Sequence, residues 1–161
     1  MTAPHHDAPC PAPVLGRRAV LAAGVGLVVM SLPLRALARP SLSEAVAGFT
    51  GGKPVEAGRV TLTVPPLVEN GNAVGVTVEV DSPMSPADHV RRIGLFNEKN
   101  PQADIAVFHL GPRNGRARLA TRIRLATSQT VVAVAELSDG TYWSSEASVI
   151  VTLAACIEDL S

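Results

Sequence analysis

The sequence holds few side chains suited to covalent chemistry, and its two cysteines are the first to consider. Cys10 lies near the start of the chain, and Cys156 follows the stretch VTLAA close to the C-terminus. A thiolate is a strong nucleophile, so a cysteine near a chain end can carry a covalently bound group. The alternative is that Cys156 is a small apolar residue at a frayed end, where it is merely open to oxidation. The sequence alone keeps both interpretations open.

Other chemistry has weaker support in the sequence. There is no CxxC, HExxH or CxxCH motif and no glycine-rich loop between a strand and a helix. These absences remove support for common zinc, haem and nucleotide sites. His89 and His109 would need a third ligand such as Cys156 to bind a metal. The alternative is that they are ordinary histidines, His89 in a loop and His109 on a strand. No Ser-His-Asp grouping can be argued from spacing, so we predict a protein that is not an enzyme and holds no metal or cofactor.

The first 38 residues have the pattern of an export signal. Arg17 and Arg18 precede an apolar run, Ala19–Leu34, and the segment closes with a small-x-small triplet that ends at Ala38. The run contains two glycines and a proline and is shorter than the roughly 20 residues that span a membrane. We therefore predict a twin-arginine signal over 1–38, a periplasmic protein and no stable membrane anchor. An ordinary secretory signal is the alternative.

Removal of this segment would take Cys10 with it and leave Cys156 as the one cysteine in an oxidising compartment. An unpaired thiol there is a liability unless it has a function or a partner, and it permits a disulfide-linked dimer. The whole chain has 14 basic and 14 acidic residues and no formal net charge. Nucleic-acid binding usually requires a basic excess, so we expect no nucleic-acid partner.

The elements that position Cys156 begin with a short helix. Ser41 and Glu44 have the spacing of a capping box, and apolar residues follow at helical spacing up to Phe49. Gly51 can end the helix in a left-handed conformation. This pattern predicts one N-terminal helix of about two turns.

The rest of the chain alternates with a period of two, which is typical of strands. Aromatic residues make up only 3% of the chain, so the core must consist of Val, Leu, Ile and Ala. Turn signals, such as ENGN at Glu69–Asn72, separate short segments at intervals of roughly 8 to 12 residues, as in immunoglobulin-like sandwiches. We predict about seven strands, at or near Val60–Val64, Val74–Val80, Ile93, Asp104–Leu110, Arg116–Leu125, Thr130–Leu137 and Ser145–Leu153.

Alternation also assigns faces to two of these strands. In the Arg116–Leu125 strand, Ala117, Leu119, Thr121, Ile123 and Leu125 should face inward, and Arg116, Arg118, Arg122 and Arg124 should face outward. The arginines are either a solvated outer face or a surface that binds an anion or a partner. In the last strand, Ala147, Val149, Val151 and Leu153 should face inward.

From Ser41 to Leu153 the sequence resembles SoxY, the sulfur carrier of bacterial thiosulfate oxidation. The matching stretches are AGFTGGKPVEAGRVTLTVPPLVENGNAVGVTVEVDSPM, FNEKNP, AVFHL, RIRLATSQTVVAVAELSDGTYW and the closing VTL. The resemblance implies a heterodimer with a second sandwich subunit, SoxZ, and a covalent carrier role for Cys156. It also implies three partner enzymes: a c-type cytochrome that attaches thiosulfate, a hydrolase that releases sulfate, and a dehydrogenase that oxidises the remaining sulfane sulfur.

The sequence departs from this family at its C-terminal arm, residues 154–161. The family ends in Gly-Gly-Cys-Gly-Gly or close to it, whereas Ala154, Ala155 and Ile157 flank Cys156 here. Ala and Ile have less conformational freedom than Gly. Glu158 and Asp159 come next in the sequence. Their negative charges disfavour the thiolate form of Cys156 and repel an anionic adduct on its sulfur. A divergent SoxY-like sandwich that binds a partner or regulates the pathway, without carrying sulfur, is therefore the alternative function.

The sequence thus predicts an all-β protein, an immunoglobulin-like antiparallel β-sandwich with a short N-terminal helix and a flexible C-terminal arm. Its expected organisation is an export signal over 1–38, the sandwich over 39–153 and the cysteine arm over 154–161. The leading functional prediction is a periplasmic sulfur carrier.

Overall fold

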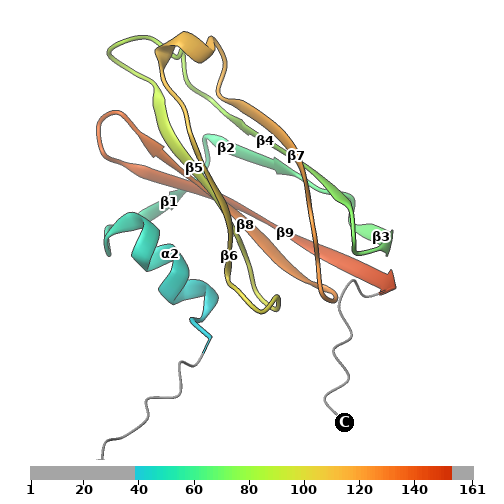
Figure 1. Ribbon diagram of the computed structural model, residues 1–161. Coiled ribbons are helices and arrows are strands. Elements are labelled where there is room, and N and C mark those ends of the chain that lie inside the picture. Colours follow the sequence, from blue (N-terminus) through green and yellow to red (C-terminus); the bar gives the residue numbers. More distant parts are fainter. Residues whose placement is uncertain (1–38, 154–161) are drawn as a thin grey trace, which may run out of the picture. The chain divides into compact units, whose positions relative to one another are not determined.

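The computed structural model describes residues 39–153, which form two β-sheets packed face to face and one short α-helix (Figure 1). In chain order the elements are α2 Leu42–Thr50, β1 Val55–Ala57, β2 Val60–Thr63, β3 Leu67–Asn70, β4 Val74–Val80, β5 Val90–Asn97, β6 Asp104–His109, the 3-10 turn η1 Pro112–Asn114, β7 Arg118–Ile123, β8 Gln129–Leu137 and β9 Tyr142–Leu153. The predicted all-β sandwich with one N-terminal helix is confirmed.

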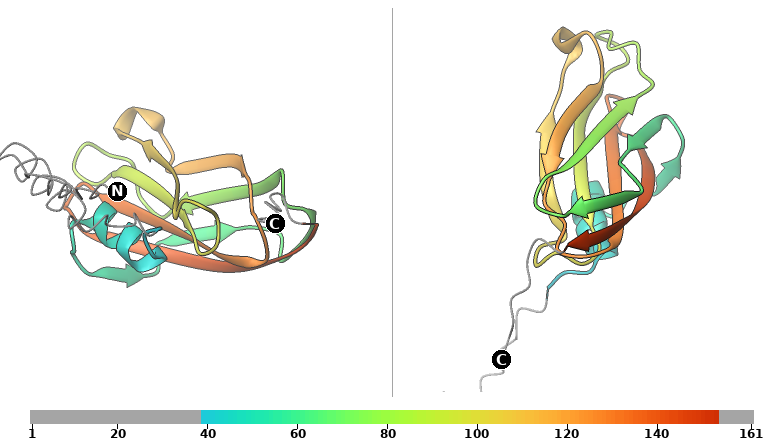
Figure 2. Two further views of the ribbon diagram at one scale, coloured as in Figure 1. Left: turned by 60° about the horizontal axis from the view of Figure 1, so that its bottom comes forward. Right: turned by 90° about the vertical axis from the view of Figure 1, so that its right-hand side faces the viewer.

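The larger sheet has the strand order β1-β9-β8-β5-β6, with β3 also paired to β9, and the smaller sheet has the order β2-β4-β7. The two sheets lie in separate layers, which Figure 2 shows from two further sides. Pairing is antiparallel within both sheets except along β9, where β1 and β3 both pair in parallel. The prediction of about seven antiparallel strands missed these two strands of three and four residues.

The helix follows the sequence prediction closely. Ser41 is its N-cap: the Glu44 amide donates to Ser41 Oγ at 3.2 Å, and the Ser41 amide donates to Glu44 Oε2 at 2.7 Å. The bond from the Ser41 amide, and after it one from the Ser41 hydroxyl to the same carboxylate, hold the pKa of the Glu44 carboxyl below its ordinary value. Gly51 ends the helix with a φ of 65°, as expected of a left-handed cap. No helix within 39–153 is long and apolar enough to cross a membrane.

The helix packs on the outer face of the larger sheet. Its Phe49 ring meets Phe96 of β5 and Tyr142 of β9 edge to face, with ring centroids 5.6 Å and 6.1 Å apart. Gly94 of β5 lies beneath these rings, and a Cβ there would come within 2.6 Å of the Phe96 ring. The missing side chain at Gly94 therefore lets the helix approach the sheet.

The main core lies between the two sheets and is almost entirely aliphatic, as the composition predicted. All four valines of the VGVTVEV stretch are buried on β4, and β8 supplies Val131, Ala133, Ala135 and Leu137. In and around β7, the predicted inward residues are buried or half-buried and the four arginines are exposed. The alternating aliphatic residues of the strands thus pack the two sheets against each other.

Two local predictions were wrong. Leu153 does not face the core, because its side chain is 70% exposed at the end of β9, where the only partner strand is β3. The ENGN stretch is not all turn, because Glu69 and Asn70 pair with β9 as part of β3 and the turn begins at Gly71. Both errors have one cause. The parallel pairing of β3 with β9 joins segments about 80 residues apart, and such a pairing cannot be predicted from local periodicity.

Candidate functional site

The predicted site residues fall outside the part of the chain that the structure describes. This holds for Cys156 and its neighbours Ala154, Ala155 and Ile157, and for the signal residues Arg17 and Arg18. The structure does describe the point from which the C-terminal arm leaves. We call this point, formed by Leu153, Gly71 and Leu125, the arm root.

Backbone hydrogen bonds fix the arm root. The Gly71 amide donates to the Leu153 carbonyl at 3.0 Å, and the Leu125 amide donates to the Gly71 carbonyl at 2.8 Å. The Thr152 hydroxyl donates to the Glu69 carbonyl at 3.2 Å. β9 is therefore held to its last residue by segments from both sheets, and Cys156 follows only three residues later.

Ser128 gives β9 a second attachment near the same end. The Val151 amide donates to Ser128 Oγ at 2.9 Å, and the hydroxyl donates back to the Val151 carbonyl at 3.3 Å. One side chain thus satisfies both backbone groups of Val151 on the β8 side of β9, beyond the last β8–β9 residue pair.

The FNEKNP stretch supports the segment that carries Ser128. Asn100 donates from Nδ2 to the Arg124 carbonyl at 2.7 Å, and its Oδ1 accepts from the Ala126 amide at 2.8 Å. Gln129 donates from Nε2 to the same Oδ1 at 2.7 Å, while its Oε1 accepts from the Lys99 amide at 2.7 Å. This network joins the β5–β6 turn to the β7–β8 connection. FNEKNP was expected only as a matching stretch of the family; the unusual density of amide side chains could have indicated its supporting role.

Exposed apolar side chains surround the arm root. Leu67 of β3 and Ile150 of β9 are direct partners in the parallel pair, with exposed fractions of 60% and 59%. With Leu153 they place three large apolar side chains beside the exit of the arm.

The predicted arginine stripe lies on and beside β7, the edge strand of the smaller sheet. Arg118 pairs with Glu79 of β4, with 2.6 Å between Nε and Oε1. Arg122 lies opposite Gly75, and Arg124 immediately precedes Leu125 of the arm root. All four arginines are exposed. Whether the stripe is simply solvated or binds a partner stays a prediction.

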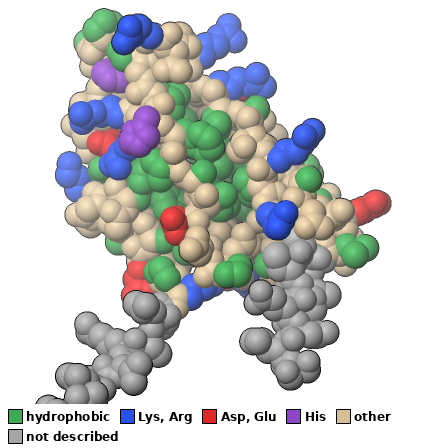
Figure 3. Space-filling view, viewed as in Figure 1, with side chains coloured by type: hydrophobic (Ala, Val, Ile, Leu, Met, Phe, Trp, Pro, Cys, Tyr) green, Lys and Arg blue, Asp and Glu red, His purple; other side chains and the backbone are tan. Residues whose placement is uncertain are grey.

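The two histidines come together at the other end of the larger sheet, in a cleft with Arg91, Arg92 and Glu136. In Figure 3 both histidines lie among basic and acidic side chains on one side of the molecule. Glu136 is only 8% exposed and forms ion pairs with both arginines. The cleft is therefore partly neutralised by its own carboxylate.

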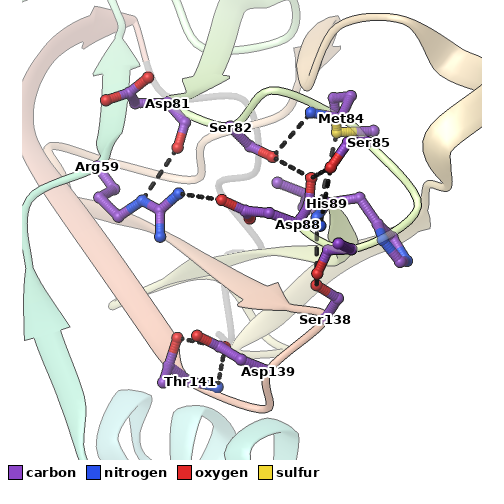
Figure 4. Close-up of polar contacts among 12 residues, drawn as sticks. Arg59, Asp81, Ser82, Met84, Ser85, Asp88, His89, Ser138, Asp139 and Thr141 are labelled. Carbon is purple, nitrogen blue, oxygen red and sulfur yellow. Dashed lines mark hydrogen bonds and ion pairs between the residues drawn. The ribbon is translucent and has the colours of Figure 1, made fainter.

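The loop before His89 follows the VDSPM stretch and is held by polar contacts (Figure 4). Arg59 binds Asp88, with 3.5 Å between Nη2 and Oδ2, and the Asp88 amide donates to Ser85 Oγ at 3.0 Å. The His89 amide donates to Ser138 Oγ at 3.2 Å, so the β8–β9 turn holds this loop. His89 Nδ1 is buried and has no hydrogen-bond partner within residues 39–153.

The strand geometry argues against a metal site that combines these histidines with Cys156. The cleft lies beside Tyr142 at the start of β9, whose cross-strand partner is Glu136. β9 is 12 residues long, roughly 36 Å of strand, and Cys156 can reach only about 10 Å beyond its end. In the described part of the chain, no three His, Cys, Asp or Glu residues are grouped so that they could hold a metal ion.

Comparison with solved structures finds several proteins with a similar fold. The structure of the sulfur carrier protein SoxY from Chlorobium limicola f thiosulfatophilum is similar over 70% of this chain and 97% of that chain, with a TM-score of 0.59 and 26% identity. A superoxide reductase (neelaredoxin) from Ignicoccus hospitalis matches 58% of this chain and 80% of its own, with a TM-score of 0.53 and 16% identity. A putative superoxide reductase from Thermotoga maritima has a TM-score of 0.50 and 19% identity, over 64% of this chain and 89% of its own. The two reductases share the fold alone.

No curated protein matches the sequence. A family model described as sulfur oxidation protein SoxY does match, over residues 46–156, which is well over half of the chain. The match runs from the middle of α2 through the whole sandwich and ends at Cys156. The chain belongs to the SoxY family.

Proposed function

We propose that this protein is a periplasmic sulfur carrier of thiosulfate oxidation and that Cys156 holds the sulfur intermediates covalently. The observation that carries the proposal is the extent of the family match, which includes Cys156 and stops there. The arm root supports it, because β9 is anchored to Leu153 and leaves the thiol three residues from a fixed support.

In the proposed cycle, the thiolate of Cys156 forms a sulfur–sulfur bond with the outer sulfur of thiosulfate. Two electrons leave in this step, and a c-type cytochrome enzyme accepts them. Water then cleaves the bond between the sulfane and sulfonate sulfurs, so that sulfate leaves and a persulfide stays on Cys156. A sulfane dehydrogenase oxidises that persulfide further. The protein's part is to hold and present the sulfur.

The neighbours of Cys156 determine how far the thiol extends. Three residues separate it from Leu153, which limits its reach to about 10 Å. Ala154, Ala155 and Ile157 would have to pass with it into each enzyme cleft, and they are bulkier and stiffer than the glycines of the family pattern. We therefore expect the partner enzymes to have wider clefts than a glycine arm requires.

The remaining parts of the proposal follow from the family and the sequence. A SoxZ-like sandwich subunit would complete the carrier as a heterodimer. Arg17 and Arg18 would direct twin-arginine export, with 1–38 as the signal, 39–153 as the sandwich and 154–161 as the carrier arm.

The decisive experiment is intact-mass spectrometry of the protein isolated from thiosulfate-grown cells of its native host. Wild-type protein should carry thiosulfonate or persulfide adducts, and the Cys156→Ser variant should carry none. An unmodified thiol in wild-type protein from cells that actively oxidise thiosulfate would overturn the proposal.

The altered arm favours one second candidate, a partner-binding or regulatory SoxY-like subunit that carries no sulfur. Replacement of residues 154–161 by Gly-Gly-Cys-Gly-Gly separates the two. A carrier should oxidise thiosulfate with the native arm. The second candidate holds if thiosulfate oxidation in the reconstituted system appears only after the replacement.

A further inference from the structure

The cleft that holds both histidines carries a positive charge and hydrogen-bond donors that the fold itself does not use. We call it the histidine cleft; it is lined by His89, Arg91, Arg92, His109, Leu110 and Glu136. It lies at the end of the larger sheet where β9 begins, whereas Leu153 ends that strand 12 residues later. A ligand of this cleft is therefore bound far from the arm root.

A β-bulge brings both arginines to the cleft. Along a regular strand, neighbouring side chains point to opposite faces. The pairing of β5 with β8 shifts register between Val90 and Arg92, and both Val90 and Ile93 are fully buried in the core. Arg91 and Arg92 therefore both reach the outer side, where each forms an ion pair with Glu136. Bulges that re-aim a side chain in this way are common next to active sites.

The two arginines have different roles. Arg92 is committed to the fold, because it pairs with Glu136, donates to the Phe49 carbonyl at 3.5 Å and covers the Phe49 ring. The Arg91 side chain is 56% exposed, and its Nη1 lies 3.7 Å from Glu136 Oε1. Two guanidinium groups thus face one carboxylate in the lining of the cleft. The unbalanced positive charge is the one that Arg91 presents to solvent.

Two acidic residues of the neighbouring loops have partners of their own. Asp88 pairs with Arg59, with 3.5 Å between Oδ2 and Nη2. Asp139 accepts from the Thr141 amide at 2.9 Å and from the Thr141 hydroxyl at 2.7 Å. In Figure 4 the Asp139 carboxylate points to Thr141 and not to His89. Glu136 is therefore the carboxylate that a ligand of the cleft meets.

His89 offers one ring nitrogen as a donor. Its Nδ1 is buried without a hydrogen-bond partner within residues 39–153, whereas its Nε2 is not buried. A buried N–H without an acceptor is rarer than a buried acceptor without a donor, so the ring proton belongs on Nε2. The ring points away from Asp88 and Ser138 (Figure 4) and lines the cleft. The Nε2–H group is thus available to a ligand there.

Backbone contacts hold these donors in place. His109 lies opposite Arg92 in the β5–β6 pair and is exposed. The Leu110 amide donates to the Arg91 carbonyl at 2.9 Å, which fixes the end of β6 against the bulge. The β8–β9 turn holds the loop of His89 from the other side. The donors are therefore positioned before a ligand arrives.

We propose that the histidine cleft binds a small tetrahedral oxyanion, such as sulfate or thiosulfate, between Arg91 and the imidazoles of His89 and His109. A guanidinium and an imidazole N–H donate, and the oxygens of the anion accept. The donors come from the loop at His89, from β5 and from β6. A ligand with several acceptor oxygens engages more of them than chloride or a carboxylate does. The inference does not depend on the carrier function, because it involves neither Cys156 nor the arm.

Imidazole ¹⁵N NMR tests the site on the full 161-residue chain. The labelled protein is titrated with sodium sulfate and, separately, with sodium thiosulfate, while sodium chloride keeps the ionic strength constant, so that binding is separated from screening. The resonances of His89 and His109 should shift along a saturating curve, and His89 should show the Nε2–H tautomer. His5 and His6 are internal controls whose shifts should not saturate. Sodium acetate should saturate none of the four.

Three variants make the test specific. Arg91→Gln should raise the half-saturating sulfate concentration at least about tenfold, because the anion loses its charged donor. Arg122→Gln, an exposed arginine of β7, is the matched control and should leave that concentration unchanged. Glu136→Gln should lower it, because it removes the carboxylate that competes for Arg91.

Shifts of His89 and His109 that stay linear with both anions in wild type would overturn the proposal. An unchanged curve in Arg91→Gln, or equal saturation by acetate, would overturn it as well. Saturation by either oxyanion with the expected loss in Arg91→Gln supports it, and the lower half-saturating concentration identifies the preferred anion. The readout does not involve sulfur at Cys156, so failure here is distinct from failure of the carrier function.

Discussion

At the scale of single residues, Arg92 links the helix to the outer face of the larger sheet. Its guanidinium pairs with Glu136 and lies over the Phe49 ring, 4.6 Å from its centroid. Glu136 is nearly buried, so removal of Arg92 would leave a carboxylate with only the more distant and exposed Arg91. One side chain therefore neutralises a buried charge and covers an aromatic ring.

We expect Arg92→Met to lower the free energy of unfolding by about 1–3 kcal/mol, because a charged hydrogen-bonding group loses its main partner. The value should lie below that of a fully buried pair because Arg92 is one-third exposed. Urea denaturation measures the change, with Arg113→Met as the control. Equal midpoints for the two variants would show that Arg91 or water replaces Arg92.

The Glu44 carboxyl should make the stability of α2 depend on pH, and the direction of its pKa shift gives the sign of this dependence. Its pKa is lowered by hydrogen bonds from Ser41 that favour the charged form. A lowered pKa stabilises the fold above the ordinary carboxyl pKa and loses this effect as pH falls through the folded value. The protection factors of the α2 amides, which correct for the intrinsic pH dependence of exchange, should therefore fall as pH drops below about 4.5, and Glu44→Ala should remove most of that pH dependence. Identical pH profiles for wild type and variant would contradict this assignment.

At the scale of elements, the contact between α2 and the larger sheet depends on Gly94. A Cβ at this position would lie 2.6 Å and 2.8 Å from two Phe96 ring atoms and 3.2 Å from the Phe49 ring. Gly94→Ala should cost about 1–3 kcal/mol through overpacking, with loss of the Phe49–Tyr142 ring contact. Gly75→Ala on β4 is the control, because its Cβ would meet nothing within 4 Å. Thermal denaturation and aromatic NMR shifts report the two effects, and a normal melting temperature for Gly94→Ala would contradict the packing argument.

Local sequence signals predicted the elements whose stability is local. The Ser41–Glu44 capping box and Gly51 defined the helix, and the alternating valines defined β4. β1 and β3 were missed because they are short and exist through parallel pairing with a distant strand. For the site, the role of Cys156 stays a prediction, and the support that Ser128 and Asn100 give to the end of β9 was not foreseen. Their roles depend on which backbone groups the fold leaves unpaired at the end of β9.

At the scale of the whole molecule, the proposed export signal determines where the carrier can work. We expect Arg17→Lys/Arg18→Lys to block export, because twin-arginine transport reads this pair. Cell fractionation should then find a 161-residue precursor in the cytoplasm in place of a 123-residue periplasmic protein, by the cleavage 161 − 38 = 123. Unchanged periplasmic protein of the shorter mass would assign the segment to the ordinary secretory route.

The arrangement of strands around β9 also has a mechanical meaning. β8 pairs with β9 over most of its length, and β1 and β3 pair with its first and last parts on the other edge. Hydrogen bonds between strands lie across the strand direction, so tension on the arm shears many of them together and does not open them one by one. A partner protein that pulls on Cys156 would thus transmit the force to the whole larger sheet. The pairing on both edges of β9 should therefore keep this strand in the sheet when its C-terminal end is pulled.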